Sequence, residues 1–238
     1  MGWFIAGSGI SDAGTWGDSF GAFNALFGAL GFAAIFATLL VQGRAIKAQQ
    51  DEQNRENFER KFFELLAIFQ RIREDVRFMH TPEYQASLPD SPRSVSRYSN
   101  GIDAIQAAVL EIKFWENRDL QHLRENPEET LREIYSTKIL RRHESRLSPY
   151  FRTAYIILNR IKYSSALNDE ERIEYANLFR GQLTSYEIIL MAVNGLAPVS
   201  RDFSELLTHF HMLKYLSRGR MQRNLERIYP KQAFSPRS

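Results

Sequence analysis

Five histidines are the first residues to consider for chemistry, because imidazole transfers protons and binds metals near neutral pH. Six residues separate Arg73 from His80, and such a pair could hold a phosphate and move a proton during RNA cleavage. That mechanism needs two pairs that face each other across a dimer, a geometry that the sequence does not show. We therefore assign no catalytic residue and keep Arg73 and His80 as the candidates that an enzyme would require. The five histidines are His80, His122, His143, His209 and His211.

A metal site is not indicated by the remaining candidates. Glu205 and His209 share a helix face if the segment is helical, but His211 would point away from them, and two ligands do not complete a site. The chain has no Cys, which excludes disulfides and thiolate chemistry. Glycine-rich phosphate loops, nucleophile elbows and His-Glu-x-x-His motifs are also missing. We expect no cofactor and no metal, and the sequence leans against an enzyme.

The element that organises the chain is the apolar stretch from Phe20 to Val41, which contains no charged residue. As a helix it would be roughly 33 Å long, enough to cross a hydrocarbon core of about 30 Å. The alternative is a buried helix of a soluble protein, but such helices rarely lack a polar face over this length. We predict a single transmembrane helix at 20–41.

Charge predicts the orientation of this helix. Residues 1–43 contain no Lys or Arg, whereas Arg44, Lys47 and Arg55 follow the apolar stretch. The positive-inside rule then places residues 1–19 outside as a short extracytoplasmic tail, with the C-terminal domain in the cytoplasm.

Small residues recur at every fourth position of the span and would form one helix face. Small side chains let a second helix approach closely, so this face predicts self-association into a homo-oligomer within the membrane lipid. The alternative is that Gly and Ala are simply common in membrane helices. The positions are Gly17, Gly21, Ala25, Ala29, Ala33 and Ala37.

Helical patterns continue after the span. We predict a charged helical stalk at 42–57 and an α-helical cytoplasmic domain at 58–219, with a mobile loop at 81–101. No comparable β-pattern occurs, so the fold class is all-α. Helix starts are predicted at Asn126-Pro127, Ser148-Pro149, Asn168 and Ser200, and the helix from Asn168 is expected to run to Asn194.

A basic tail is predicted at 220–238. From Lys214 to Arg237 there are seven basic residues and one acid, so this end could bind phosphates of anionic lipid or nucleic acid. The alternative is a solvated, frayed terminus. The candidate phosphate-binding residues are Arg218, Arg220, Arg223 and Arg227.

Several short motifs in order resemble the phage abortive infection protein family of bacteria. They are Trp16-Gly17-Asp18, Phe62-Phe63-Glu64-Leu65-Leu66, Tyr150-Phe151-Arg152-Thr153-Ala154-Tyr155, and Gln182-Leu183-Thr184-Ser185-Tyr186-Glu187 before Asn194-Gly195. The resemblance extends from Trp16 to about Tyr215. It implies a protein of the bacterial inner membrane with a helical cytoplasmic domain and a role in antiviral defence, and it supplies no catalytic motif.

Four polar residues on largely apolar helices are candidates for a structural or partner-binding role: Arg152, Gln182, Glu187 and Asn194. Such groups must be solvated or paired. A bridge between Arg152 and Glu187 would be structural, whereas the same groups could equally line a surface that meets a partner.

Three functional interpretations remain at this point. The first is a non-enzymatic defence protein that recognises a phage or host protein and assembles in the membrane. The second is a membrane-tethered ribonuclease similar to the HEPN type. The third is a scaffold whose basic tail binds lipid or nucleic-acid phosphates, of which nucleic acid is the less favoured partner.

Overall fold

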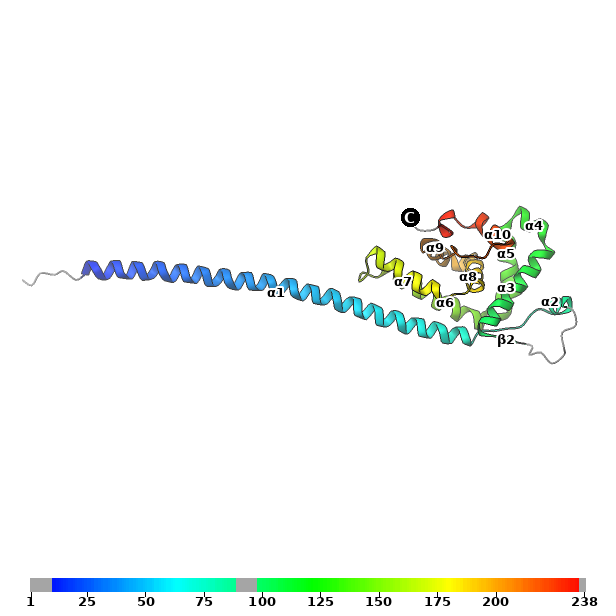
Figure 1. The fold of residues 1–238 in the computed structure, drawn as a ribbon, viewed down its shortest axis with the longest axis horizontal. Coiled ribbons are helices and arrows are strands. Elements are labelled where there is room, and N and C mark those ends of the chain that lie inside the picture. The colour runs from blue at the N-terminus through cyan, green and yellow to red at the C-terminus, as the bar shows by residue number, and fades with distance from the viewer. Residues whose placement is uncertain (1–9, 89–97, 236–238) are drawn as a thin grey trace, which may run out of the picture. The chain divides into compact units, whose positions relative to one another are not determined.

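The computed structural model describes residues 10–88 and 98–235, except for the side chains of 10–20 and 22. The chain divides into two compact units, Met1–Glu56 and Asn57–Ser238. Helix α1, Ile10–Glu74, begins in the first unit and ends in the second (Figure 1). The described elements are almost entirely helical, which confirms the all-α prediction.

The described part of the first unit is helical, and its described side chains are exposed. Every described side chain from position 23 to 57 is exposed, including Phe32 at 71% and Val41 at 66%. This part of α1 is long and apolar enough to cross a membrane. Thr38 donates its hydroxyl to the Ala34 carbonyl across 2.8 Å, so this polar group needs no water. The features expected of a span are therefore present in the described residues of this helix.

The second unit is a bundle of short helices that follows the end of α1. Its helices are α2 Pro82–Ser87, α3 Gly101–Arg118, α4 Leu120–Glu125, α5 Pro127–Ile134, α6 Arg141–Tyr163, α7 Asp169–Gly181, α8 Ser185–Asn194, α9 Arg201–His209 and α10 Arg220–Ile228. A π-helical segment, Tyr135–Leu140, joins α5 to α6, and 3-10 turns occupy Pro198–Ser200 and Lys231–Ala233.

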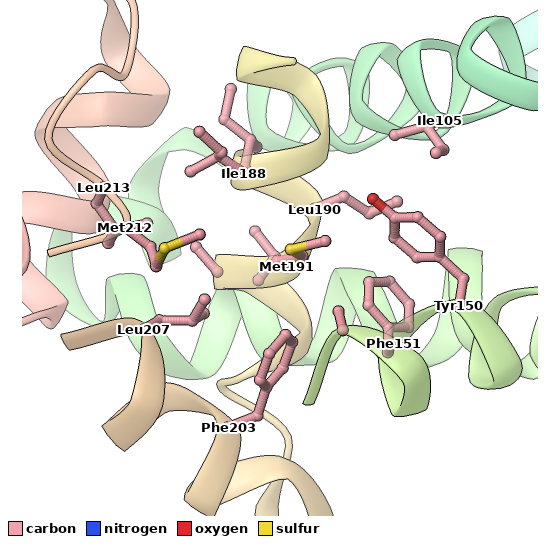
Figure 2. Packing of buried hydrophobic residues seen from close by; sticks show 14 of the residues in the cluster. Ile105, Tyr150, Phe151, Ile188, Leu190, Met191, Phe203, Leu207, Met212 and Leu213 are labelled. Carbon is pink, nitrogen blue, oxygen red and sulfur yellow. The ribbon is translucent and has the colours of Figure 1, made fainter. Parts of the chain in front are cut away.

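Helix α8 lies at the centre of this bundle. All its residues from Glu187 to Asn194 are buried, which is unusual because most helices keep one solvated face. Figure 2 shows Met191 of α8 among side chains from α6, α9 and the segment after α9. The core is therefore assembled around one short apolar helix.

Aromatic rings join the end of α1 to α6 and α7. The Phe62 ring lies edge-on to Tyr175 at 5.0 Å between centroids, and Phe69 contacts both Tyr150 and Phe179 at 5.0 and 5.2 Å. Edge-to-face pairs at these distances are favourable beyond the area they bury. The last turns of α1 are thus part of the domain core.

The helix start predicted at Ser148-Pro149 is wrong. Pro149 lies inside α6, which begins at Arg141. Proline removes one backbone donor and crowds the carbonyl four residues earlier. The backbone leaves helical geometry at His143 (φ −129°, ψ 18°), which lies six residues before Pro149. Burial of Leu147, Tyr150 and Phe151 holds the helix together across the proline.

The single helix predicted from Asn168 to Asn194 is in fact two helices. Asn168 begins α7 with a capping box, as the sequence indicated, but α7 ends at Gly181. Thr184 then opens α8 with a second capping box, in which its side chain and that of Glu187 each accept a backbone N–H. The Thr-x-x-Glu spacing is typical of such a helix start. The apolar periodicity continues from α7 into α8, and it therefore predicted one helix instead of two.

The segment predicted as a loop at 81–101 contains regular structure. Thr81 caps α2, and strand β1, Arg77–Phe78, pairs antiparallel with β2, Ser99–Asn100. Gly101 follows with φ +58°, a conformation that favours glycine, and its N–H bonds the Val76 carbonyl at 2.8 Å. Part of the predicted mobile loop, 89–97, lies outside the described residues.

The C-terminal part has the helix start expected at Ser200 but differs from the expected basic tail. Ser200 precedes α9, which ends at His209, and His211 adopts φ 52°. The segment expected as a basic tail contains α10, with Met221 and Leu225 buried and Tyr229 buried just after it. Arg220, Arg223 and Arg227 are therefore carried on a packed amphipathic helix.

Candidate functional site

Glu187 is the one charged residue of α8, and its fully buried side chain anchors a polar cluster. Its Oε1 accepts a hydrogen bond from the Tyr150 hydroxyl at 2.9 Å and lies 3.7 Å from Nη1 of Arg73. Its Oε2 accepts the Thr184 N–H at 2.7 Å. Burial, together with the neighbouring Glu187 carboxylate, raises the pKa of Tyr150 well above its ordinary value. The cluster ties α1, α6 and α8 together inside the domain.

The four polar candidates divide between the interior and the surface. Glu187 pairs with Arg73 among the described residues, so the bridge to Arg152 considered above does not form, and Arg152 is exposed. Asn194 is buried and donates to the Tyr135 hydroxyl at 2.8 Å. Gln182 is exposed; its main-chain carbonyl accepts from Arg73 at 2.9 Å, and its side-chain Oε1 accepts from Gln70 at 3.2 Å. Only Arg152 and Gln182 can meet a partner without opening the core.

His80 belongs to a second cluster, around the buried Glu111 of α3. Its Nδ1 lies 2.8 Å from Oε2 of Glu111, whose two oxygens also accept the Thr81 N–H at 3.1 Å. Burial alone would raise the pKa of Glu111, but the hydrogen bonds from His80 and Thr81 outweigh it and hold that pKa below its ordinary value. Nη1 of Arg142 lies 3.9 Å from the same carboxylate.

Ring contacts and a histidine complete this cluster. Tyr84 stacks on His80 with ring centroids 4.0 Å apart. His143 Nε2 lies 3.1 Å from the Met79 carbonyl, and burial lowers the pKa of His143. The neutral ring that results donates to the carbonyl and packs against Phe78 at 4.5 Å. The arrangement fixes the turn between β1 and α2 against α3 and α6.

The structure places Arg73 and His80 in these two different clusters. Arg73 faces the N-terminus of α8, while His80 faces α3. Within one chain they do not form a common site, and the paired arrangement that RNA cleavage would need stays a prediction. In the described residues no three His, Asp or Glu side chains come together as a group that could hold a metal ion.

The basic residues of the C-terminal segment occupy several different positions. Arg218 and Arg220 line a cavity of about 590 Å³ between α3, the start of α8 and the start of α10. Arg227 donates to the Arg124 carbonyl at 2.8 Å, and Arg223 is exposed on α10. The sequence did not indicate which of these residues share a cavity, because only packing of α10 against α3 brings them there.

A buried carboxylate in the wall of this cavity was not identified from the sequence. Glu116 is fully buried, and its Oε1 accepts from Asn224 at 3.0 Å, but its Oε2 has no hydrogen-bond partner among the described residues. Burial raises the pKa of Glu116, and the hydrogen bond from Asn224 and the charges of Arg220 and Lys113 only partly oppose this. Its position on α3 after an apolar run gave no signal of such a role.

A larger cavity of about 760 Å³ lies between α5, the end of α6, α9 and the segment after α10. Arg132, Lys162 and Arg201 line it together with Glu128 and Glu205. The mixture of charges indicates no single class of ligand.

The small residues of the span remain available for contact. Gly21, Ala25, Ala29, Ala33 and Ala37 are all exposed, and a Cβ added at Gly21 would meet nothing within 4 Å. Gly17 lies in the part of α1 whose exposure the structure does not describe.

Comparison with known proteins gives one family match. The family model described as "Putative phage abortive infection protein" matches residues 142–221, which extend from the start of α6 to the start of α10. Searches of curated proteins and of solved structures find no match. The matched region contains Tyr150 and Glu187 as well as the central helix α8.

Proposed function

Proceeding from the match of residues 142–221 to the abortive infection family, we propose that this protein is a membrane-anchored component of bacterial defence against bacteriophage. In this proposal α1 anchors the chain in the inner membrane. The helical domain recognises a phage or host protein in the cytoplasm. This recognition leads to defence through the assembly of several chains in the membrane. The observation that carries the proposal is an exposed apolar helix joined to a separately packed domain, of which residues 142–221 match the family.

The anchoring role is supported by the described part of the span. Its large apolar side chains are exposed, and burying them in lipid would remove apolar area from water at about 25 cal/mol per Å². The basic residues that follow, beginning at Arg44, favour a cytoplasmic C-terminal domain.

Self-association is supported by the open face of small residues from Gly21 to Ala37. Close approach of two such faces gains van der Waals contact, which drives helix association where the hydrophobic effect is absent. A single span without charged residues cannot form a pore alone, so any membrane damage would require this assembly.

Partner recognition is supported by a stripe on α6. Arg152, Ile156 and Tyr163 are four and seven residues apart, which places them on one face of the helix. Ile156 is 41% exposed and Tyr163 69% exposed, although the opposite face of α6 is core. Arg and Tyr are the residue types that dominate binding at protein interfaces. We name these three residues the α6 stripe.

The recognition role is tested by phage plating on cells that express the chain. We expect protection by the wild type and its loss in Arg152→Glu/Tyr163→Glu at equal protein abundance. Glu170→Arg, an exposed charge reversal on α7, is the matched control and should retain protection. Crosslinking in infected cells should capture a phage or host protein with the wild type and the control but not with the stripe variant.

Two outcomes would overturn this proposal. If the wild type protects against no phage in a broad panel, the defence role is wrong. If the stripe variant protects as well as Glu170→Arg does, recognition does not use α6.

Assembly is tested separately by Gly21→Leu/Ala25→Leu. We expect a smaller oligomer in membranes and in detergent, whereas Phe27→Leu, on another face of the same helix, should leave the size unchanged. An unchanged oligomer in the double variant would remove the small-residue face from the proposal.

A further inference from the structure

The cavity of about 590 Å³ between α3, α8 and α10 has the properties of a small-molecule site. Its volume lies within the range of about 300–1,000 Å³ that ligand pockets occupy. It combines three basic side chains, one buried carboxylate, an aromatic ring and aliphatic walls. We name it the α3–α10 cavity. The side chains that the argument uses are Lys113, Glu116, Tyr186, Ile189, Arg218 and Arg220.

The basic side chains of the cavity suit a phosphate. Lys113, Arg218 and Arg220 bring three positive charges to a lining whose one acidic residue is Glu116. Gly219, the N-cap of α10, provides no side chain that bonds the first N–H groups of that helix. Free N–H groups at a helix start bind anions, and arginine and lysine side chains add charge-assisted hydrogen bonds.

Glu116, one of the lining residues, has a buried carboxylate oxygen that accepts no hydrogen bond among the described residues. Oε2 of this fully buried carboxyl lacks a partner, whereas Oε1 already accepts from Asn224 at 3.0 Å. A buried acceptor without a partner is costly, and a ligand that donates one hydrogen bond would relieve this. A fully deprotonated anion could not do so.

The remaining walls suit a flat ring. Tyr186 is half-buried, and Nζ of Lys113 lies 5.4 Å from its ring centroid. Ile189 is buried beside it in the same lining. Together these walls offer apolar contact to a heterocycle of the size of a nucleobase.

We propose that the α3–α10 cavity binds a nucleoside phosphate whose base carries an exocyclic amino group as the one donor on its pairing edge, as adenine and cytosine do. Arg218, Arg220 and Lys113 hold the phosphate, and Tyr186 and Ile189 contact the base. Glu116 Oε2 accepts the amino hydrogen. Adenine donates once through its amino group, which matches the single orphaned oxygen, whereas guanine presents two donors side by side. This inference rests on the cavity and not on the defence role or the anchor.

Binding of 5′-AMP to the detergent-solubilised full-length protein, measured by calorimetry, tests the phosphate contacts. We expect Arg218→Ala to weaken binding by about tenfold, the loss of one charge-assisted hydrogen bond. Arg223→Ala removes an exposed arginine that does not line the cavity and should leave the affinity unchanged. If both variants weaken AMP equally, the effect is general electrostatic attraction and the site is wrong.

A change of ligand tests the Glu116 contact on the wild-type protein, so the fold is not altered. Purine riboside 5′-monophosphate lacks the amino group and should bind the wild type about tenfold more weakly than AMP does. In Glu116→Met the two ligands should bind equally. Equal affinity of both ligands for the wild type would overturn the assignment of Glu116.

Two further probes separate the nucleotide from simpler sources of phosphate. Inorganic phosphate and glycerophosphoethanolamine should each bind the wild type more weakly than AMP. Binding of either probe as tightly as AMP, or failure of AMP to bind at millimolar concentration, would overturn the proposal.

Discussion

The Tyr150 hydroxyl donates to Oε1 of Glu187 across 2.9 Å in the interior of the domain, where both side chains are fully buried. A buried carboxylate needs such donors because water cannot reach it. Tyr150→Phe should therefore lower the free energy of unfolding by roughly 1–3 kcal/mol. Urea titration of the solubilised protein measures this, with Tyr163→Phe, 69% exposed, as the control. Equal stability of Tyr150→Phe and the wild type would contradict the prediction.

Thr184→Ala should destabilise the domain by about 1 kcal/mol, because the Thr184 side chain accepts the Glu187 N–H at 3.2 Å and begins the central helix. Thr184→Ser keeps the capping oxygen and should restore most of the stability. Thermal unfolding of the three proteins compares them directly. A serine variant as unstable as the alanine variant would show that the methyl group, and not the cap, matters.

Gly195→Ala should destabilise the protein by about 1–3 kcal/mol, the usual cost of overpacking a core. An added Cβ would lie 2.6 Å from the Tyr229 hydroxyl and 3.3 Å from Cα of Ser204. The Tyr229 hydroxyl is held by its hydrogen bond to the Ala192 carbonyl at 2.7 Å, so it cannot move freely. Gly181→Ala, which would meet nothing within 4 Å, is the matched control and should be neutral or stabilising.

Glu111 and Glu116 should respond to pH in opposite ways. The pKa of Glu111 is lowered by folding, so its contribution to stability is present above the ordinary value of 4.5 and lost as pH falls. Glu111→Gln should therefore reduce the urea midpoint at pH 7 and reduce it less in acid.

The pKa of Glu116 is raised by folding, so its favourable contribution is present below 4.5 and lost as pH rises through the folded value. Glu116→Gln should increase the urea midpoint at pH 7 and change it little at pH 4. The same sign of change at pH 7 in both variants would contradict these assignments.

Orientation in the membrane can be tested cleanly because the chain has no native Cys. In spheroplasts, Ser8→Cys should react with a membrane-impermeant maleimide, whereas Ser164→Cys should react only after the membrane is permeabilised. The reverse pattern would show that the helix is inverted with respect to the positive-inside rule.

The sequence by itself determined the features that depend on neighbouring residues. The absence of charge from Phe20 to Val41 predicted a long apolar helix, and spacing of three and four predicted an all-α domain. The start of α7 at Asn168 followed from local capping chemistry, which needs only residues within one turn. The same chemistry was present at Thr184 but was hidden by the apolar period that continues across 182–184.

Only the tertiary structure decided which faces meet. Arg73 and Glu187 pair because α1 ends against the start of α8, and nothing in the spacing of either helix specifies its neighbour. The pattern shows that a helix has an apolar side, whereas the packing of side chains from distant segments selects the helix that covers it. Packing of α10 against the domain likewise turned an expected tail into one wall of the cavity that contains Glu116 and Arg220.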